Sequence, residues 1–189
     1  MSEARKLDHK ATYQDILDLP EGVRGEIIDG ELIVSPRPSP KHLKASYALG
    51  HKIGGPFEFG ENGGPGGWWI VPEPEVKFGE NTLVPDLAGW RKERLPSPPN
   101  TNWFEVIPDW ICEVISPSST RHDRVSKWNT YATHGVNYYW LIDPIAQTLE
   151  ALRLDQGHWV AVGNYGGDQK VRVEPFDAIE IDLAQLWWG

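Results

Sequence analysis

The amino-acid sequence predicts an α/β fold with a mixed β-sheet core flanked by helices, an N-terminal helix and hairpin, and C-terminal β-hairpins. A length of 189 residues suits one domain, and we expect residues 1–189 to form it. Residues 110–143 follow the pattern strand, helix, strand, which is that of a βαβ unit with a right-handed crossover. Short apolar runs bounded by Gly, Pro and Asp lie on both sides of this unit and are typical of antiparallel strands.

The first elements are a helix and a hairpin. Residues 12–19 predict a short helix with Thr12 as its N-cap, which the Pro-Glu-Gly sequence after it ends. Residues 25–36, GEIIDGELIVSP, predict a hairpin, because Asp29 and Gly30 tolerate the positive φ that a two-residue turn requires.

A longer helix is predicted over residues 41–53, with Gly54-Gly55-Pro56 ending it. The positions expected to face the core are Leu43, Tyr47, Leu49 and Ile53. Residues 54–67 are rich in glycine and predict a loop.

The next segments predict strands. Pro72 and Pro74 confine the residues around them to an edge or irregular strand, and residues 75–78 form the strand proper. The apolar run over residues 83–90 predicts another strand, which Pro85-Asp86 interrupts.

The βαβ unit supplies the central strands. Residues 110–115 are apolar except for Glu113, the pattern of a buried strand, and residues 116–120 predict a turn. The helix that follows ends at Gly135, and residues 136–143 form the second strand. Three further strand segments are expected near the C-terminus, at residues 148–154, 158–165 and 170–176.

The charge of the chain argues against a broad basic surface for nucleic acid. Lys and Arg number 18 and Asp and Glu number 27, so the net charge is −9. Binding to nucleic-acid phosphates depends largely on Lys and Arg. In a chain of this net charge, a local basic patch would have to supply that binding. The residues expected to form it are Arg24, Lys41, Lys44, Lys52, Arg121, Arg124 and Lys127.

The composition also predicts the cellular setting. No apolar run approaches the ~20 residues that span a bilayer, and the N-terminus has no apolar signal segment. We therefore expect a cytoplasmic protein without membrane association. Ten tryptophans, with pairs at 68–69 and 187–188, favour core and interface roles. Because exposed tryptophan pairs and edge strands favour self-association, we expect a homo-oligomer, most simply a dimer.

Two carboxylates and a lysine carry the candidate chemistry. Glu113 lies inside an apolar strand, where an unpaired acid costs several kcal/mol. Asp86 lies at the end of another strand, and two such acids can share one Mg²⁺, whose bound water becomes a nucleophile. Lys127, on the following helix, can orient that water. Alternatively, Glu113 pairs with an arginine, Asp86 caps a turn and Lys127 is a solvated helix residue.

The motifs VPDLAGW, EVISPSS and HGVNYYWLIDP, together with the first hairpin, resemble the Uma family of restriction-endonuclease-like proteins, within the PD-(D/E)XK nuclease superfamily. The resemblance covers most of residues 13–160. It implies a restriction-endonuclease-like fold and a Mg²⁺-dependent endonuclease, with Mn²⁺ as a substitute, acting on DNA rather than RNA.

The resemblance also implies roles for individual residues. Asp86 and Glu113 match the catalytic acids that hold the metal. Ile115 stands where the family's strand lysine is usual, so the resemblance implies that Lys127 takes its role. The possible site neighbours are Glu26, His42 and Tyr131.

A second function class remains open. A non-catalytic binding or assembly module would keep the same fold and use its aromatic surface, and the net charge and the missing strand lysine favour it. A third alternative, a carbohydrate-binding protein or a glycosidase with paired carboxylates, is supported by the tryptophan content alone.

Overall fold

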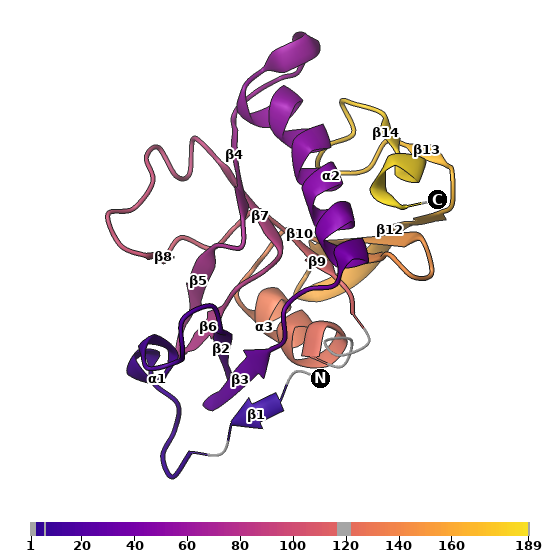
Figure 1. The fold of residues 1–189 in the computed structure, drawn as a ribbon. Helices are drawn as coiled ribbons and strands as arrows, with labels where there is room; N and C mark the ends of the chain where they lie inside the picture. The colour runs from indigo at the N-terminus through magenta and orange to yellow at the C-terminus, as the bar shows by residue number, and fades with distance from the viewer. Residues whose placement is uncertain (1–2, 6, 117–121, 189) are drawn as a thin grey trace.

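Two six-stranded sheets and a two-stranded ribbon hold the strands of the computed structural model, which describes residues 3–5, 7–116 and 122–188 (Figure 1). The first sheet has the order β1 (Glu3–Arg5), β3 (Glu31–Ser35), β2 (Arg24–Ile28), β6 (Asn81–Leu83), β5 (Glu75–Phe78), β8 (Trp103–Phe104). The second has the order β12 (His158–Gly166), β11 (Thr148–Asp155), β10 (Tyr138–Asp143), β9 (Trp110–Val114), β7 (Leu87–Arg91), β4 (Trp68–Pro72). Pairs β5–β8 and β9–β10 are parallel and the other pairs are antiparallel, so the predicted mixed α/β class is confirmed.

The N-terminal helix and hairpin form as predicted. Helix α1 (Tyr13–Leu17) begins after Thr12, whose backbone N–H and hydroxyl each donate to the Asp15 carboxylate at 2.7 Å. This satisfies one of the backbone donors left open at a helix start. Strands β2 and β3 meet at Asp29 and Gly30, with φ of 53° and 83°.

The chain passes from the first sheet to the second at Val84-Pro85-Asp86. Strand β6 ends at Leu83 in one sheet, and β7 begins at Leu87 in the other. The predicted apolar strand over residues 83–90 is therefore two strands, because proline lacks the N–H that continued pairing requires. Asp86 lies at the crossing point.

The βαβ unit is confirmed. Strands β9 and β10 pair in parallel, with Glu113 opposite Leu141. Between them lie the π-helical turn η2 (His122–Lys127) and helix α3 (Trp128–Thr133), followed by Gly135 at φ 78°. Of the predicted turn over 116–120, residues 117–120 lie outside the described residues.

The long helix α2 (Pro40–Glu58) corrects two predictions. It continues through Gly54-Gly55-Pro56 to Glu58, where burial of Phe57 against Phe176, with ring centroids 4.7 Å apart, stabilises its last turn. The buried stripe repeats every four residues, so Leu43 and Tyr47 fall outside it and are 53% and 73% exposed. The stripe consists of Ala45, Leu49, Ile53 and Phe57.

Aromatic side chains fill the space between α2 and the second sheet. Trp68, Trp110 and Trp140 surround Phe176, with ring centroids 4.9–5.7 Å away. The expectation that the tryptophan pairs are exposed is wrong for their buried members, Trp68 and Trp187, whereas Trp188 is 56% exposed. Oligomerisation therefore stays a prediction that rests on the edge strands.

The C-terminal strands form in part. Strands β11 and β12 form the predicted hairpin. The predicted strand over residues 170–176 is reduced to β13 (Lys170–Val171), which pairs with β14 (Ile181–Asp182) before the turn η3 (Leu183–Leu186). The indole N–H of Trp140 donates to the Glu174 carbonyl at 2.9 Å. This part of the segment is therefore held by a side chain of the core and not by backbone pairing with another strand. Among the described residues, no helix combines the length and apolar character that crossing a membrane requires.

Candidate active site

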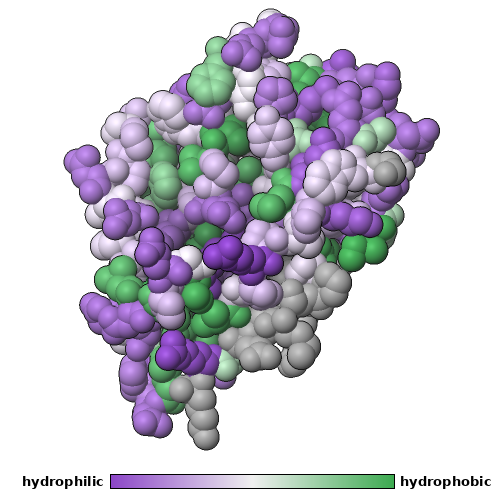
Figure 2. Space-filling model, in the orientation of Figure 1, coloured by the Kyte–Doolittle hydropathy of each residue, from purple (hydrophilic) through white to green (hydrophobic). Residues whose placement is uncertain are grey.

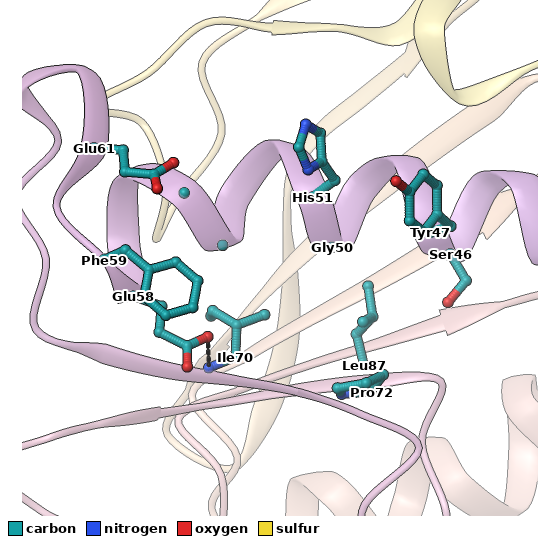
Figure 3. A pocket seen from close by; sticks show the side chains of 12 residues that line it. Ser46, Tyr47, Gly50, His51, Glu58, Phe59, Glu61, Ile70, Pro72 and Leu87 are labelled. Carbon is teal, nitrogen blue, oxygen red and sulfur yellow. Dashed lines mark hydrogen bonds between the residues drawn. The ribbon is translucent and has the colours of Figure 1, made fainter.

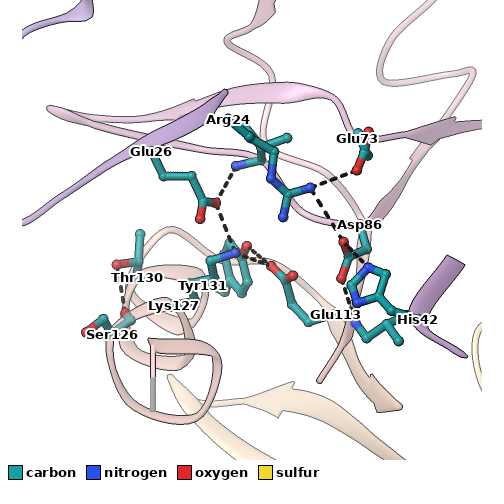
Figure 4. Close-up of polar contacts among 12 residues, drawn as sticks. Arg24, Glu26, His42, Glu73, Asp86, Glu113, Ser126, Lys127, Thr130 and Tyr131 are labelled. Atoms are coloured by element: carbon teal, nitrogen blue, oxygen red, sulfur yellow. Dashed lines mark hydrogen bonds and ion pairs between the residues drawn. The ribbon is translucent and has the colours of Figure 1, made fainter. Parts of the chain in front are cut away.

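Asp86 is held between the two sheets by three neighbours (Figure 4). Its Oδ1 lies 2.9 Å from Nε2 of His42 on α2, and its Oδ2 accepts the N–H of Val114 on β9 at 2.7 Å. Arg24 on β2 approaches Oδ1 at 3.6 Å. With only 2% of its surface exposed, Asp86 is fixed in one orientation by α2, β2 and β9 together.

Lys127 joins the two sheets through their acids. Its Nζ lies 3.1 Å from Oε1 of Glu113 on β9 and 2.9 Å from Oε1 of Glu26 on β2. Its side chain is 3% exposed, so the prediction of a basic surface at Lys127 is wrong, and so is the alternative of a solvated helix residue. A buried ammonium between two carboxylates makes charge-assisted hydrogen bonds, which offset part of the cost of taking these groups out of water.

The possible neighbours named from the sequence also lie in this cluster. Tyr131 follows Lys127 by one helical turn, and its hydroxyl donates to Oε1 of Glu113 at 2.6 Å. Glu26 accepts the backbone N–H of Val84 at 2.8 Å, next to the crossing point. All six predicted site residues therefore converge, although they come from β2, α2, the crossing segment, β9, η2 and α3.

Neighbouring charges set the ionisation of this cluster. Burial alone would raise the pKa of Asp86, but the hydrogen bond and charge of His42, with Arg24 and Lys127, hold it below its ordinary value. Burial raises the pKa of Tyr131 well above its ordinary value, and the charge of Glu113 raises it further. Asp86 is thus a carboxylate at neutral pH, while Tyr131 remains a protonated donor.

Arg24 and Glu73 belong to the cluster, and sequence reasoning missed their place in it. Arg24, expected only as a surface cation, donates through a terminal guanidinium nitrogen to Oε1 of Glu73 at 2.8 Å. Although burial lowers the pKa of Arg24, Asp86 and the other acids raise it overall. A signal was available, because Arg24 and Glu26 are two apart on a strand and so share one face.

Glu73 has an unusual backbone. Its φ is 46°, a conformation that favours glycine, and its N–H donates to the Asp86 carbonyl at 3.1 Å. The turn after β4 thus holds the Glu73 carboxylate at the solvent side of Arg24, whose side chain is 30% exposed.

Other titratable residues, and the position of the missing strand lysine, lie outside the cluster. Ile115, at the position of the missing strand lysine, is buried in a hydrophobic cluster. His134 makes a ring contact with Phe78, and His158 is exposed. Of the predicted basic surface residues, Arg121 and the side chain of Arg124 lie outside the described part of the chain.

The donor atoms of the cluster suit a hard divalent cation. Asp86 and Glu113 offer carboxylate oxygens, and Mg²⁺ is usually bound by one or two carboxylates together with waters and substrate phosphate. No group of three or more His, Cys, Asp or Glu side chains able to hold a metal occurs within residues 3–5, 7–116 and 122–188. Cys112 is not available as a thiolate ligand for a metal, because it is buried and burial raises the pKa of its thiol.

Comparisons with known proteins agree with this geometry. The sequence model of the Uma2 family, described as "Putative restriction endonuclease", matches residues 11–184. A crystal structure described as "a putative nuclease belonging to DUF820", from Anabaena variabilis, aligns with a TM-score of 0.74 at 26% identity, covering 93% of this chain and 97% of that one. No curated protein matches the chain.

Proposed function

Because the chain belongs to the Uma2 family, we propose that it is a Mg²⁺-dependent endonuclease that hydrolyses phosphodiester bonds in DNA. One observation carries the proposal. Asp86 and Glu113, at the crossing point and on the adjacent strand β9, lie in one buried cluster with Lys127. Membership in a family described as restriction endonucleases supports a hydrolytic role for this cluster and favours DNA over RNA as the substrate.

Asp86 and Glu113 would hold the metal. Both are buried, and the depressed pKa of Asp86 supplies a negative charge for the cation at neutral pH. A bound Mg²⁺, or Mn²⁺ in its place, would supply positive charge for the scissile phosphate and lower the pKa of a water.

Lys127 would act on the attacking water and on the charge that develops at phosphorus. Its ammonium is already oriented by Glu26 and Glu113, so its N–H donors need no reorganisation during the reaction. Tyr131 fixes Glu113 from the same helix face. The lysine thus fills the role that the strand position, occupied by Ile115, leaves open.

Arg24 would bind the substrate phosphate. Its planar guanidinium suits phosphate oxygens, and its side chain is the more exposed of the two cations that face Asp86. In the free protein Glu73 occupies one of its donors at 2.8 Å, and a phosphate would replace that carboxylate. His42 keeps Asp86 in place during this exchange.

Cleavage assays test the proposal. The wild-type protein is incubated with DNA and RNA in Mg²⁺ or Mn²⁺, beside Asp86→Asn. We expect cleavage of DNA, and a loss of at least about a hundredfold in the variant, as when one group that stabilises the transition state is removed.

Asp109→Asn is the matched control. Asp109 is also a buried acid, 4% exposed, and it pairs with Arg94 at 2.7 Å outside the cluster. The Asp109→Asn variant should cleave at the wild-type rate when equal amounts of folded protein, verified by thermal melting, are compared. Equal cleavage by Asp86→Asn and the wild type would reject the assignment.

A non-catalytic module is the second candidate. In favour of it, the cluster already pairs Lys127 with Glu26 and Glu113, as a purely structural ion cluster would. Such a module would bind DNA or a second copy of itself without cleavage in any divalent metal. The same assay, run over a range of Mg²⁺ and Mn²⁺ concentrations, separates the two functions.

A further inference from the structure

A groove of about 400 Å³ runs along one side of α2, and the cluster around Asp86 does not account for it (Figure 3). Its walls are α2 on one side and strands β4 and β7 on the other. In Figure 2, apolar side chains gather in the recess between α2 and β4. The volume is within the range of small-molecule sites, which begins at roughly 300 Å³.

The groove lies next to the candidate active site. Leu87, which lines its floor, directly follows Asp86 in the chain. Ser46, at the same end, lies one helical turn after His42, so both are on the same face of α2. A ligand that reaches the Asp86 cluster therefore has this groove beside it.

Missing side chains keep the groove open. Gly54 is buried within α2, yet a Cβ added there would meet no atom within 4 Å. Gly50 faces Leu87, whose Cδ2 would lie 3.3 Å from an added Cβ. Glycine inside a helix is unfavourable, and the hollow is thus maintained against the preference of the helix.

Aromatic rings lie at both ends of the groove. Tyr47 and His51 stack with their planes 8° apart, and Tyr47 is 73% exposed. Phe59, at the other end, is 70% exposed. Exposed flat rings beside a phosphodiester site provide surfaces on which nucleobases stack.

Two carboxylates determine which part of a nucleotide, the phosphate or the base, can enter the groove. Glu58 is held by the backbone N–H of Ile70 at 3.3 Å, and Glu61 also lines the groove. These acids repel phosphate but accept hydrogen bonds from the amino group of a base, as Glu does from cytosine N4. The sugar–phosphate backbone would then lie over Arg24 and Lys127, with the base in the groove.

We propose that this groove binds one unpaired nucleobase carrying an exocyclic amino group, next to the phosphate that is cleaved. The substrate would accordingly be single-stranded, or would have a nucleotide turned out of the duplex. This inference rests on the proposed nuclease function.

Binding without cleavage tests it. Fluorescently labelled oligo(dC), oligo(dT) and a duplex of equal length are titrated with full-length protein in EDTA, and anisotropy is measured. We expect oligo(dC) to bind more tightly than oligo(dT) or the duplex. Gly54→Leu, which fills the groove, should weaken oligo(dC) binding by at least about tenfold, the loss expected for one stacked base.

Two control variants distinguish the effect of filling the groove from the effect of unfolding the protein. Gly54→Ala makes a similar change in helix propensity but adds one methyl group, so its loss of affinity should be smaller. Trp188→Ala removes an exposed aromatic ring outside the groove and should bind like the wild type. Thermal melting confirms that each variant is folded.

The outcomes distinguish the groove from the catalytic assignment. Wild-type affinity of folded Gly54→Leu for oligo(dC), or equal affinity of the wild type for oligo(dC) and oligo(dT), overturns the groove inference even if Asp86→Asn abolishes cleavage. Loss of oligo(dC) binding in Gly54→Leu upholds it, even where cleavage proves independent of Asp86.

Discussion

The Nζ of Lys127 lies 3.1 Å from the Glu113 carboxylate, although the two residues come from a helical turn and a strand 14 positions apart. This contact holds η2, which follows β9 in the chain, against that strand. The other neighbour of Lys127, Glu26, belongs to the first sheet. Lys127 is therefore an electrostatic link between the two sheets as well as a candidate catalytic group.

Removing the Lys127 ammonium should destabilise the fold strongly. In Lys127→Met, the aliphatic chain remains, but Glu26 and Glu113 stay buried near each other without their shared cation. We expect the free energy of unfolding to fall by about 3–5 kcal/mol, as for a broken buried ion pair. Urea denaturation measures it, with the exposed Lys170→Met as control. A loss below about 1 kcal/mol would contradict the buried pairing.

The stability contributed by Asp86 should depend on pH. Its pKa is lower in the folded chain than in the unfolded chain, where it is about 3.9. The contribution is then complete above the unfolded value and is lost as the pH falls through the folded one. In acid, Asp86→Asn should lose less stability than the wild type, as measured by urea denaturation from pH 7 downward. Parallel curves for the two proteins would refute the shift.

Tyr131→Phe should impair cleavage more than it impairs folding. The variant removes the hydroxyl that donates to Glu113 at 2.6 Å and leaves the ring packed. Tyr13→Phe is a closely matched control, because the Tyr13 hydroxyl donates to Glu75, also at 2.6 Å, outside the cluster. We expect about tenfold slower cleavage in Tyr131→Phe only, corresponding to roughly 1.4 kcal/mol, the scale of one hydrogen bond to a charged group. Equal cleavage rates for Tyr131→Phe and Tyr13→Phe would show that Tyr131 contributes only through packing of its ring.

Variants of Arg24 and Glu73 should have opposite effects. Arg24→Ala loses the proposed phosphate ligand, so KM for DNA should rise by about tenfold or more, with a smaller change in kcat. Glu73→Gln weakens the competing ion pair at 2.8 Å, so KM should fall. Steady-state kinetics at several salt concentrations measures both. A rise of KM in Glu73→Gln would show that Glu73 positions Arg24 rather than competing for it.

Local patterns in the sequence were sufficient to predict most elements. The Asp29-Gly30 turn, the βαβ unit and the buried acid Glu113 each follow from a few neighbouring residues. The core face of α2 did not, because the register of a buried stripe depends on the surface it packs against. Leu43 and Tyr47 lie off that stripe although they are apolar enough to belong to it.

The sequence predicted the residues of the candidate site one by one, and only the folded structure shows how they contact one another. The sequence indicates that Glu113 needs a partner, but not that Lys127 supplies it together with Glu26. The role of Arg24 depends on the position of Glu73, a residue with positive φ that no local signal marks. Such contacts join segments 49 positions apart, beyond the reach of periodicity.

Binding of Mn²⁺, measured by calorimetric titration of the wild type, Asp86→Asn and Glu113→Gln, tests the metal centre most directly. We predict one site in the wild-type protein that is lost in both variants and kept in Asp109→Asn, which alters a buried acid outside the cluster. Binding of Mn²⁺ by Asp86→Asn and Glu113→Gln with the affinity of the wild type, or no binding by any of the four folded proteins, would contradict a metal-dependent site at these two carboxylates.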